Sequence, residues 1–457
     1  MNRDLEAVVW TRLAVKPMKM GRIYLTDTEC RFTYDPDYLV SGLPGLGLVL
    51  SPAIYQDRTI VRQRTGRFDF LPPIQGLMPP RDTGNFQRNL ALRYLREAGY
   101  TGTAGFETDW EILKLVGHGG IGHLDVFEDD ENALRWYSQP ARHALFDMDE
   151  DAPFSYKDFL TWFDGEADTL IQLIGPTPSV GGAIPKLLIS IPDSGWDHRI
   201  GPPTRGATAG VTDVVLKFEQ SATYPGITEL EALALDVHRD LGFEVPRYWL
   251  TTFKEIPALA VERFDRDASH TPVFTETLFS VIASGNPDIL NHYDFSYDGI
   301  AKALGMPDIA LVSDRDESLV HLFRRLVASF ITGNGDLHLE NLSILVRGDQ
   351  RGFSPVYDPT PMRAYSIHNM LNVMPFGNYG EFVTGHDDPI RFGEALQRFA
   401  RACGIRPSDA GGIITDILEK TNDYPERIDA LGRVPPPNKK ELTSVYRMTR
   451  KLLEQSF

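Results

Sequence analysis

The sequence predicts an α+β protein with two lobes, a mixed N-terminal lobe and a mainly α-helical C-terminal lobe. Short β-like runs alternate with helical stretches and Pro/Gly breaks up to about residue 270. Beyond about residue 275, apolar residues recur mostly with helical spacing. At 457 residues the chain is longer than one hydrophobic core usually serves, so we expect more than one structural unit.

Composition narrows the class of protein. Hydrophobic residues make up 42% and charged residues 24%, which is typical of a globular chain. The two cysteines, Cys30 and Cys403, exclude a disulfide framework and favour a reducing cytoplasm. We expect no signal peptide, no membrane span and a cytoplasmic location. A net charge of −17 disfavours a large DNA contact, so any DNA contact should come mainly through a partner.

We expect three segments. Residues 1–135 form a small α+β subdomain, and an acidic stretch follows it. Residues 136–270 form the core of the N-terminal lobe, and residues 271–457 form the helical C-terminal lobe.

The middle segment is predicted to form one antiparallel sheet with a helix against it. The helix carries apolar residues at helical spacing and is stopped by Gly242. The four β-like runs are Lys186–Ser190, Asp213–Phe218, Pro246–Phe253 and Ala258–Phe264.

In the last segment, one helix ending near Ile331 presents a continuous apolar face. Further helices are expected at 390–403, 411–421 and 439–455, and Pro435–Pro437 is expected to form a stiff loop. The apolar face consists of Leu319, Leu322, Phe323, Leu326, Val327 and Phe330.

The segment after that helix carries the strongest chemical signal. Asp336 precedes Asn341 by five positions in a Gly-rich turn, and Asp358, which we expect in a β-like setting, follows further along the chain. Phosphoryl transfer needs one carboxylate to orient the attacking hydroxyl and oxygen ligands to hold Mg²⁺, and this spacing equals that of the protein-kinase catalytic loop. Taken alone, Asp and Asn are also common turn residues.

Upstream residues strengthen this interpretation. Lys217 ends an apolar strand where a nucleotide-contacting lysine is expected, and Glu229 or Glu231 on the next helix could pair with it. Small residues in the turn at Ser179–Lys186 would let backbone N–H groups approach phosphates, although such a turn is also typical of a hairpin. The run Val261–Arg266 occupies the place of a kinase hinge; an edge strand is the alternative.

With these motifs, the chain resembles the HipA family of bacterial toxin kinases over nearly its whole length. Gly117–Gly122 resembles the family's N-terminal glycine turn more loosely. The matching segments are Ser-Val-Gly-Gly-Ala at Ser179, Val-Glu-Arg-Phe-Asp-Arg at Val261, Asn-Gly-Asp-Leu-His-Leu-Glu-Asn at Asn334 and Tyr-Asp at Tyr357.

The resemblance implies a role for each matching residue. Asp336 would be the catalytic base, Asn341 and Asp358 would hold Mg²⁺, and Ser179 would be autophosphorylated, which ejects its loop and switches the kinase off. The remaining residues would bind ATP. They are Gly181, Gly182, Ala183, Ile184, Lys186, Lys217, Glu262, Phe264, His338 and Tyr357.

It also implies a biological role. Family members are Ser/Thr protein kinases that use ATP and Mg²⁺ and act as the toxin of a toxin–antitoxin pair. A small helix-turn-helix antitoxin (HipB-like) joins them to operator DNA. Known members phosphorylate aminoacyl-tRNA synthetases, stall translation and promote dormancy.

Two positions depart from the family pattern. Ile184 stands where the family usually has glutamine, and Glu340 where it has lysine. Two alternatives therefore stay open: an ATP-binding, catalytically weak repressor partner, and a small-molecule phosphotransferase.

Overall fold

The structure of the protein is a computed structural model, and its described residues divide into two compact units. Unit 1 takes in Met1–Phe218, Arg247–Glu276 and Ser280–Leu290, and unit 2 the rest of the chain. Helices and strands in both confirm the predicted α+β class. The described residues are 4–14, 16–66, 69–81, 85–138, 145–147, 184–205, 208–253, 255–306, 309–379 and 389–457.

Unit 1 begins with a five-stranded antiparallel sheet in the order β4-β3-β2-β1-β5. In β3 buried and less buried positions alternate, and its buried side contributes Cys30, Phe32 and Tyr34 to the core. The strands are β1 (Leu5–Thr11), β2 (Met18–Leu25), β3 (Glu29–Tyr34), β4 (Ile60–Gln63) and β5 (Leu124–Phe127). The helices are α1 (Pro36–Leu39), α2 (Pro52–Tyr55), α3 (Pro72–Gln75), α4 (Phe86–Glu97), α5 (Phe106–Val116) and α6 (Asp130–Ser138).

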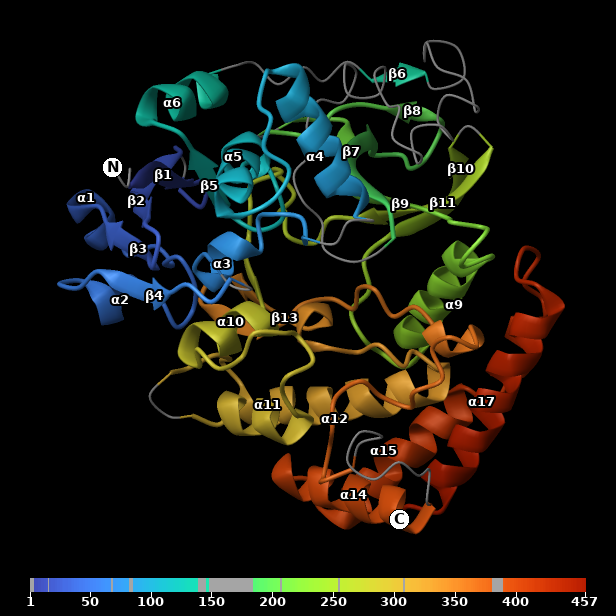
Figure 1. Ribbon diagram of the computed structural model, residues 1–457. Helices are drawn as coiled ribbons and strands as arrows, with labels where there is room; N and C mark the ends of the chain where they lie inside the picture. The colour runs from blue at the N-terminus through green and yellow to red at the C-terminus, as the bar shows by residue number, and fades with distance from the viewer. Residues whose placement is uncertain are drawn as a thin grey trace. The chain divides into compact units, whose positions relative to one another are not determined.

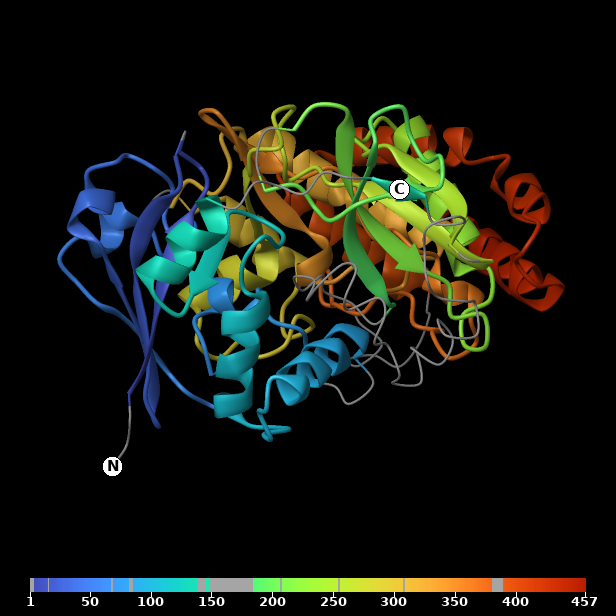
Figure 2. The same cartoon turned by 90° about the horizontal axis from the view of Figure 1, so that it is seen from above.

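A second antiparallel sheet, in the order β10-β11-β9-β7, confirms the four predicted strands (Figure 2). Its core is separate from that of the first sheet, and Leu90 of α4 packs into it. The helix stopped by Gly242, α9 (Ile227–Asp240), groups with unit 2. The sheet's strands are β7 (Lys186–Pro192), β9 (Val211–Phe218), β10 (Tyr248–Phe253) and β11 (Ile256–Glu262). Strands β6 (Phe146–Asp147) and β8 (Arg199–Ile200) pair antiparallel in a separate two-stranded sheet.

A buried ion network fixes the glycine turn at Gly117–Gly122. Asp265 accepts hydrogen bonds from Arg263 and from Arg266, and also from the backbone N–H of Gly122 at 2.8 Å. Both arginines in turn donate to the carbonyl oxygen of Gly120. The charged residues at the end of the Val261–Arg266 run therefore hold the Gly117–Gly122 turn in place, although the two segments are far apart in the sequence.

A buried glutamate, Glu276, should make unit 1 sensitive to pH. Its carboxylate accepts the N–H of Leu48 at 2.7 Å and the hydroxyl of Ser280 at 2.6 Å. Burial raises its pKa from 4.5 to about 7, although both hydrogen bonds oppose the rise. The folded chain thus keeps a proton that the unfolded chain releases between these pH values, so stability should fall as pH rises through that window.

Replacing Glu276 by Gln is expected to remove this loss, because the amide stays neutral at every pH. Its oxygen can accept the N–H of Leu48, and its N–H can donate to the Ser280 oxygen once that hydroxyl rotates. The free energy of unfolding of Glu276→Gln should exceed that of the wild type above pH 7 by up to about 3 kcal/mol and match it near pH 5. Urea titrations across this pH range measure it, with the exposed Glu128→Gln as control. Parallel pH profiles for wild type and Glu276→Gln would contradict the assignment.

Unit 2 is mainly helical, and its centre is α12 (Arg315–Thr332) (Figure 1). All six residues of the predicted apolar face are buried, and α15 and α17 pack against this helix. The other helices are α11 (Tyr297–Leu304), α14 (Pro389–Ala402), α15 (Pro407–Lys420), α16 (Tyr424–Asp429) and α17 (Pro436–Glu454), with the 3-10 turns η1 (Leu339–Asn341) and η2 (Met362–Ala364). Strand β13 (Ser343–Arg347) pairs antiparallel with β14 (Gln350–Phe353). Strand β12 (Phe274–Thr277) and helix α10 (Leu278–Gly285) contain residues of both units.

The expected stiff loop at Pro435–Pro437 is wrong. Pro435 is the N-cap of α17, and Pro436 and Pro437 form its first turn. A proline lacks the N–H that the first turn leaves unpaired anyway, and its fixed φ suits a helix start. The other predicted helices, at 390–403, 411–421 and 439–455, correspond to α14, α15 and α17.

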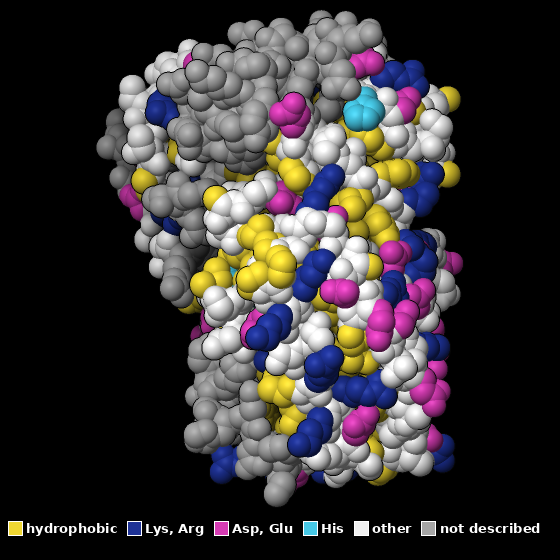
Figure 3. Space-filling view, turned by 90° about the vertical axis from the view of Figure 1, so that its right-hand side faces the viewer, with side chains coloured by type: hydrophobic (Ala, Val, Ile, Leu, Met, Phe, Trp, Pro, Cys, Tyr) yellow, Lys and Arg dark blue, Asp and Glu magenta, His cyan; other side chains and the backbone are white. Residues whose placement is uncertain are grey.

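The distribution of surface charges and the state of the two cysteines are as expected from the amino-acid composition. Figure 3 shows basic and acidic side chains interspersed on one face. Cys30 and Cys403 are both buried and form no disulfide. Within the described ranges, the helices are too short or too polar for one of them to cross a membrane.

Candidate active site

The loop after α12 turns sharply because two glycines adopt left-handed backbone. Gly333 caps the helix with φ 72°, and Gly335 has φ 67°. A Cβ on Gly335 would lie 2.7 Å from Cγ of Arg363 and 3.0 Å from the carbonyl oxygen of Met370, so a larger residue has no room there. These turns determine the direction in which the chain presents Asp336.

Hydrogen bonds close the loop on itself. Oδ1 of Asn334 accepts the N–H of Asp336 at 2.8 Å. Nδ2 of Asn341 donates to the carbonyl oxygen of Asp336 at 2.9 Å, which joins the two residues of the predicted five-residue spacing. Because Nδ2 of Asn341 is used in this way, its Oδ1 is the atom that a metal ion would meet.

Asp336 lies in an environment suited to proton transfer. Burial raises the pKa of its carboxyl to about 6, and the negative charge of Asp358 adds to the rise, whereas His292 and a hydrogen bond from Tyr293 oppose it. The hydroxyl of Tyr293 donates to Oδ1 of Asp336 at 3.4 Å. A carboxyl whose pKa approaches neutrality is typical of a general base.

Asp358 holds an unusual backbone conformation. Its φ is 51°, and the next residue is Pro359, which further restricts the residue before it. The expected β-like setting is wrong, since Asp358 lies in an irregular segment after β14. Backbone strain of this kind clusters at functional sites. Burial and the negative charge of Asp358 both raise the pKa of the Asp336 carboxyl.

Tyr357 is hydrogen-bonded to the loop at Glu340. Its hydroxyl donates to the carbonyl oxygen of Glu340 at 2.5 Å and shares a hydrogen bond with Oγ of Ser343 at 2.7 Å. Burial raises the pKa of Tyr357, so the phenol stays protonated. This hydroxyl therefore fixes the end of η1.

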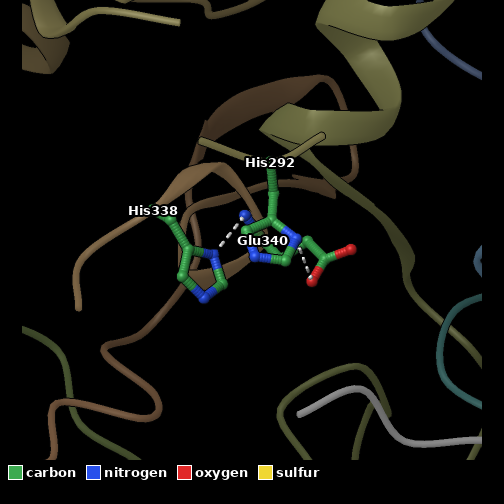
Figure 4. Close-up of side chains that lie close together, drawn as sticks. All are labelled: His292, His338 and Glu340. Atoms are coloured by element: carbon green, nitrogen blue, oxygen red, sulfur yellow. Dashed lines mark hydrogen bonds and ion pairs between the residues drawn. The ribbon is translucent and has the colours of Figure 1, made fainter. Parts of the chain in front are cut away.

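His338 lies beside Asp336, with Nε2 3.9 Å from Oδ2 of the carboxylate. Its ring stacks on His292 with 4.1 Å between ring centres, and Nδ1 of His292 lies 3.2 Å from Oε2 of Glu340 (Figure 4). His292 and Tyr293 were not among the residues predicted from the sequence, because both come from a segment far from the loop along the chain.

Two lysines lie opposite each other in the second sheet of unit 1. Lys186 on β7 and Lys217 on β9 are register partners, so their side chains share one face of the sheet. They are 3% and 6% exposed, and Leu187 and Leu216 face the core on the other side. Two lysines on one face of adjacent strands offer ammonium donors that a bound anion such as phosphate could use.

The carboxylate of Glu262 forms an ion pair with Arg247. It accepts two hydrogen bonds from the guanidinium of Arg247, each 2.9 Å long. Phe264 is half-buried beside the Arg263–Asp265 network. The backbone N–H of Glu262 also donates to the carbonyl oxygen of Arg247, at 2.9 Å.

The two candidate partners of Lys217 on α9 differ in setting. Glu229 accepts the backbone N–H of Arg433 at 2.6 Å, whereas Glu231 is buried. Ser179, Gly181, Gly182 and Ala183 lie outside the described residues, and Ile184 is half-buried at the start of β7.

The described residues form a two-unit α+β protein with the Asp336–Asn341 loop after α12. The family model of the HipA-like C-terminal domain matches residues 178–424, more than half of the chain. The chain belongs to this family.

Three relatives illustrate the likeness. A Haemophilus influenzae protein named "Putative kinase" is 28% identical over 296 residues, covering 58% of this chain and 79% of the relative. A Sinorhizobium fredii protein named "Putative kinase Y4dM" is 32% identical over 174 residues, covering 34% of this chain and 38% of the relative. The Shewanella oneidensis structure of a toxin–antitoxin system with HipA, HipB and operator DNA has TM-score 0.59 at 17% identity, covering 96% and 95% of the two chains. This last likeness shows the fold.

Proposed function

We propose that the protein is a Mg-ATP-dependent Ser/Thr protein kinase. The observation that carries the proposal is the closed loop, in which Nδ2 of Asn341 donates to the carbonyl oxygen of Asp336. Burial and the charge of Asp358 also raise the pKa of the Asp336 carboxyl. Asp336 would accept the proton of the attacking hydroxyl at one of its carboxylate oxygens. Both relatives whose names include the word kinase agree with this.

The donor set fits magnesium. Oδ1 of Asn341 and the carboxylate of Asp358 are hard oxygen ligands, which Mg²⁺ prefers. When bound, Mg²⁺ would neutralise charge on the nucleotide phosphates. Lys186 and Lys217 would hold phosphate, with Gly181, Gly182, Ala183 and Ile184 as the proposed loop, and Glu262, Phe264, His338 and Tyr357 around the nucleotide.

Lys217 offers a direct test of phosphate binding. Lys217→Met keeps most of the length of the side chain and suits the apolar strand, but it removes the cation. We expect ATP affinity, measured by calorimetry, to fall by about 10- to 100-fold, as the loss of a charged hydrogen bond predicts. The exposed Lys440→Met should bind as the wild type does. Unchanged affinity in Lys217→Met would remove this lysine from the site.

The biological setting is also a proposal. A HipB-like helix-turn-helix antitoxin would bind the chain and carry most of the DNA contact, as the Shewanella complex of HipA, HipB and operator DNA and the net charge of −17 suggest. The substrate would be a protein of translation such as an aminoacyl-tRNA synthetase, and Ser179 would be the site of autophosphorylation. The three-part division at residues 135 and 270 stays a proposal, which the separate cores of the two sheets in unit 1 support.

Incubating the full chain with γ-labelled ATP, Mg²⁺ and a cell lysate tests the function. Label on serine or threonine of the chain or of a lysate protein is the expected result. Tight ATP binding without label would favour the repressor partner, for which Glu340 is the motivation. Label only on a metabolite would favour a small-molecule phosphotransferase.

A further inference from the structure

We infer that His292, His338 and Glu340 form a binding site for a first-row transition metal ion of the Zn²⁺ type. One ligand atom from each side chain lies within 4.8 Å of the other two. Figure 4 shows the two rings and the carboxylate converging from two segments of unit 2. The site shares His338 with the proposed nucleotide site, but metal binding needs no nucleotide and is tested without one.

The ligand types favour zinc over magnesium. Two imidazoles and one carboxylate are a donor set that Zn²⁺ binds in proteins, with a remaining position for water. Mg²⁺ prefers oxygen ligands, which Asn341 and Asp358 supply elsewhere in the loop. Ligand chemistry would therefore direct the two ions to different places.

The geometry needs only a small adjustment. Ligand atoms around tetrahedral zinc lie about 3.3 Å apart, given bonds of about 2 Å. Nδ1 of His292 and Oε2 of Glu340 are already 3.2 Å apart. These two side chains are 28% and 39% exposed, so they can rotate towards the less exposed ring of His338.

Local bonding also permits the metal. The backbone N–H of Glu340 donates to Nδ1 of His338 at 3.2 Å, a long hydrogen bond that a metal ion at that nitrogen would replace. The carboxylate of Asp336, 3.9 Å from Nε2 of His338, adds negative charge that attracts a cation. An ion there would join the segment before α11 to the loop after α12.

Equilibrium dialysis of the chelator-treated full chain against Zn²⁺, in the presence of excess Mg²⁺, tests the site. The wild type should hold one Zn²⁺ at this site. The affinity should fall by about 100-fold in His292→Ala and by at least about tenfold in Glu340→Gln. Zn²⁺ should also raise the melting temperature of the wild type but not that of His292→Ala.

His270→Asn is the matched control. It removes an imidazole outside the cluster, and asparagine tolerates the left-handed backbone found there, with φ 59°. It should bind Zn²⁺ as the wild type does. Equal Zn²⁺ binding by wild type, His292→Ala and Glu340→Gln, or complete displacement of Zn²⁺ by Mg²⁺, would overturn the inference.

Discussion

Replacing Asp336 by Asn is expected to lower the rate of phosphoryl transfer by about a thousandfold, because the amide cannot accept the proton of the attacking hydroxyl. Asn has nearly the same shape, and its Oδ1 can still accept the hydrogen bond from Tyr293. The backbone contacts with Asn334 and Asn341 do not involve the replaced side chain atoms. The rate is measured from the initial transfer of label from γ-labelled ATP with Mg²⁺ in excess.

Nucleotide binding should separate this effect from misfolding. ATP affinity of Asp336→Asn should match that of the wild type or be slightly tighter, since one negative charge near the phosphates is lost. Asp349→Asn, an exposed carboxylate in the turn between β13 and β14, is the control and should keep full activity. A wild-type rate in Asp336→Asn would exclude Asp336 as the base.

The loop itself was predictable because its residues are contiguous. The five-residue spacing of Asp336 and Asn341 is visible in the sequence, and the hydrogen bond between them is its direct structural counterpart. The apolar face of α12 was predictable for a similar reason, since helical spacing places all six residues on one side. Local patterns thus predicted the helix and the loop that it presents.

Contacts between distant segments could not be predicted in the same way. The facing of Lys186 and Lys217 depends on strand register, which no local pattern specifies. His292 reaches Glu340 only because the chain returns to the loop after α12. The three prolines at Pro435–Pro437 fit either a stiff loop or a helix start, and the helical residues after them decide the outcome.

The Val261–Arg266 run contains both predicted nucleotide-binding residues and residues that bind the Gly117–Gly122 turn. Its family resemblance drew attention to Glu262 and Phe264, whereas the structure shows that Arg263, Asp265 and Arg266 bind the glycine turn. Asp265 and Gly122 are 143 positions apart in the sequence. A separation of that size leaves no local signal of the contact in the sequence.

Replacing Asp265 by Ala is expected to lower the free energy of unfolding by about 3 to 5 kcal/mol, because it leaves two buried arginines without their carboxylate. Burial opposes ionisation of Asp265, but Arg263 and Arg266 outweigh it and hold its pKa well below the usual range. The change also removes the acceptor of the Gly122 N–H. Urea denaturation followed by tryptophan fluorescence measures the loss.

The control is a surface ion pair between residues two positions apart, as Arg263 and Asp265 are. Asp197 accepts from Arg199 at 2.6 Å, and the side chains are 36% and 51% exposed. Water can solvate Arg199 once its partner is gone, so Asp197→Ala should change the free energy of unfolding little. Arg263 and Arg266 are buried and cannot be solvated in that way, so the difference between the two variants measures the contribution of burial. Equal effects of Asp197→Ala and Asp265→Ala would show that the Asp265 network does not stabilise unit 1.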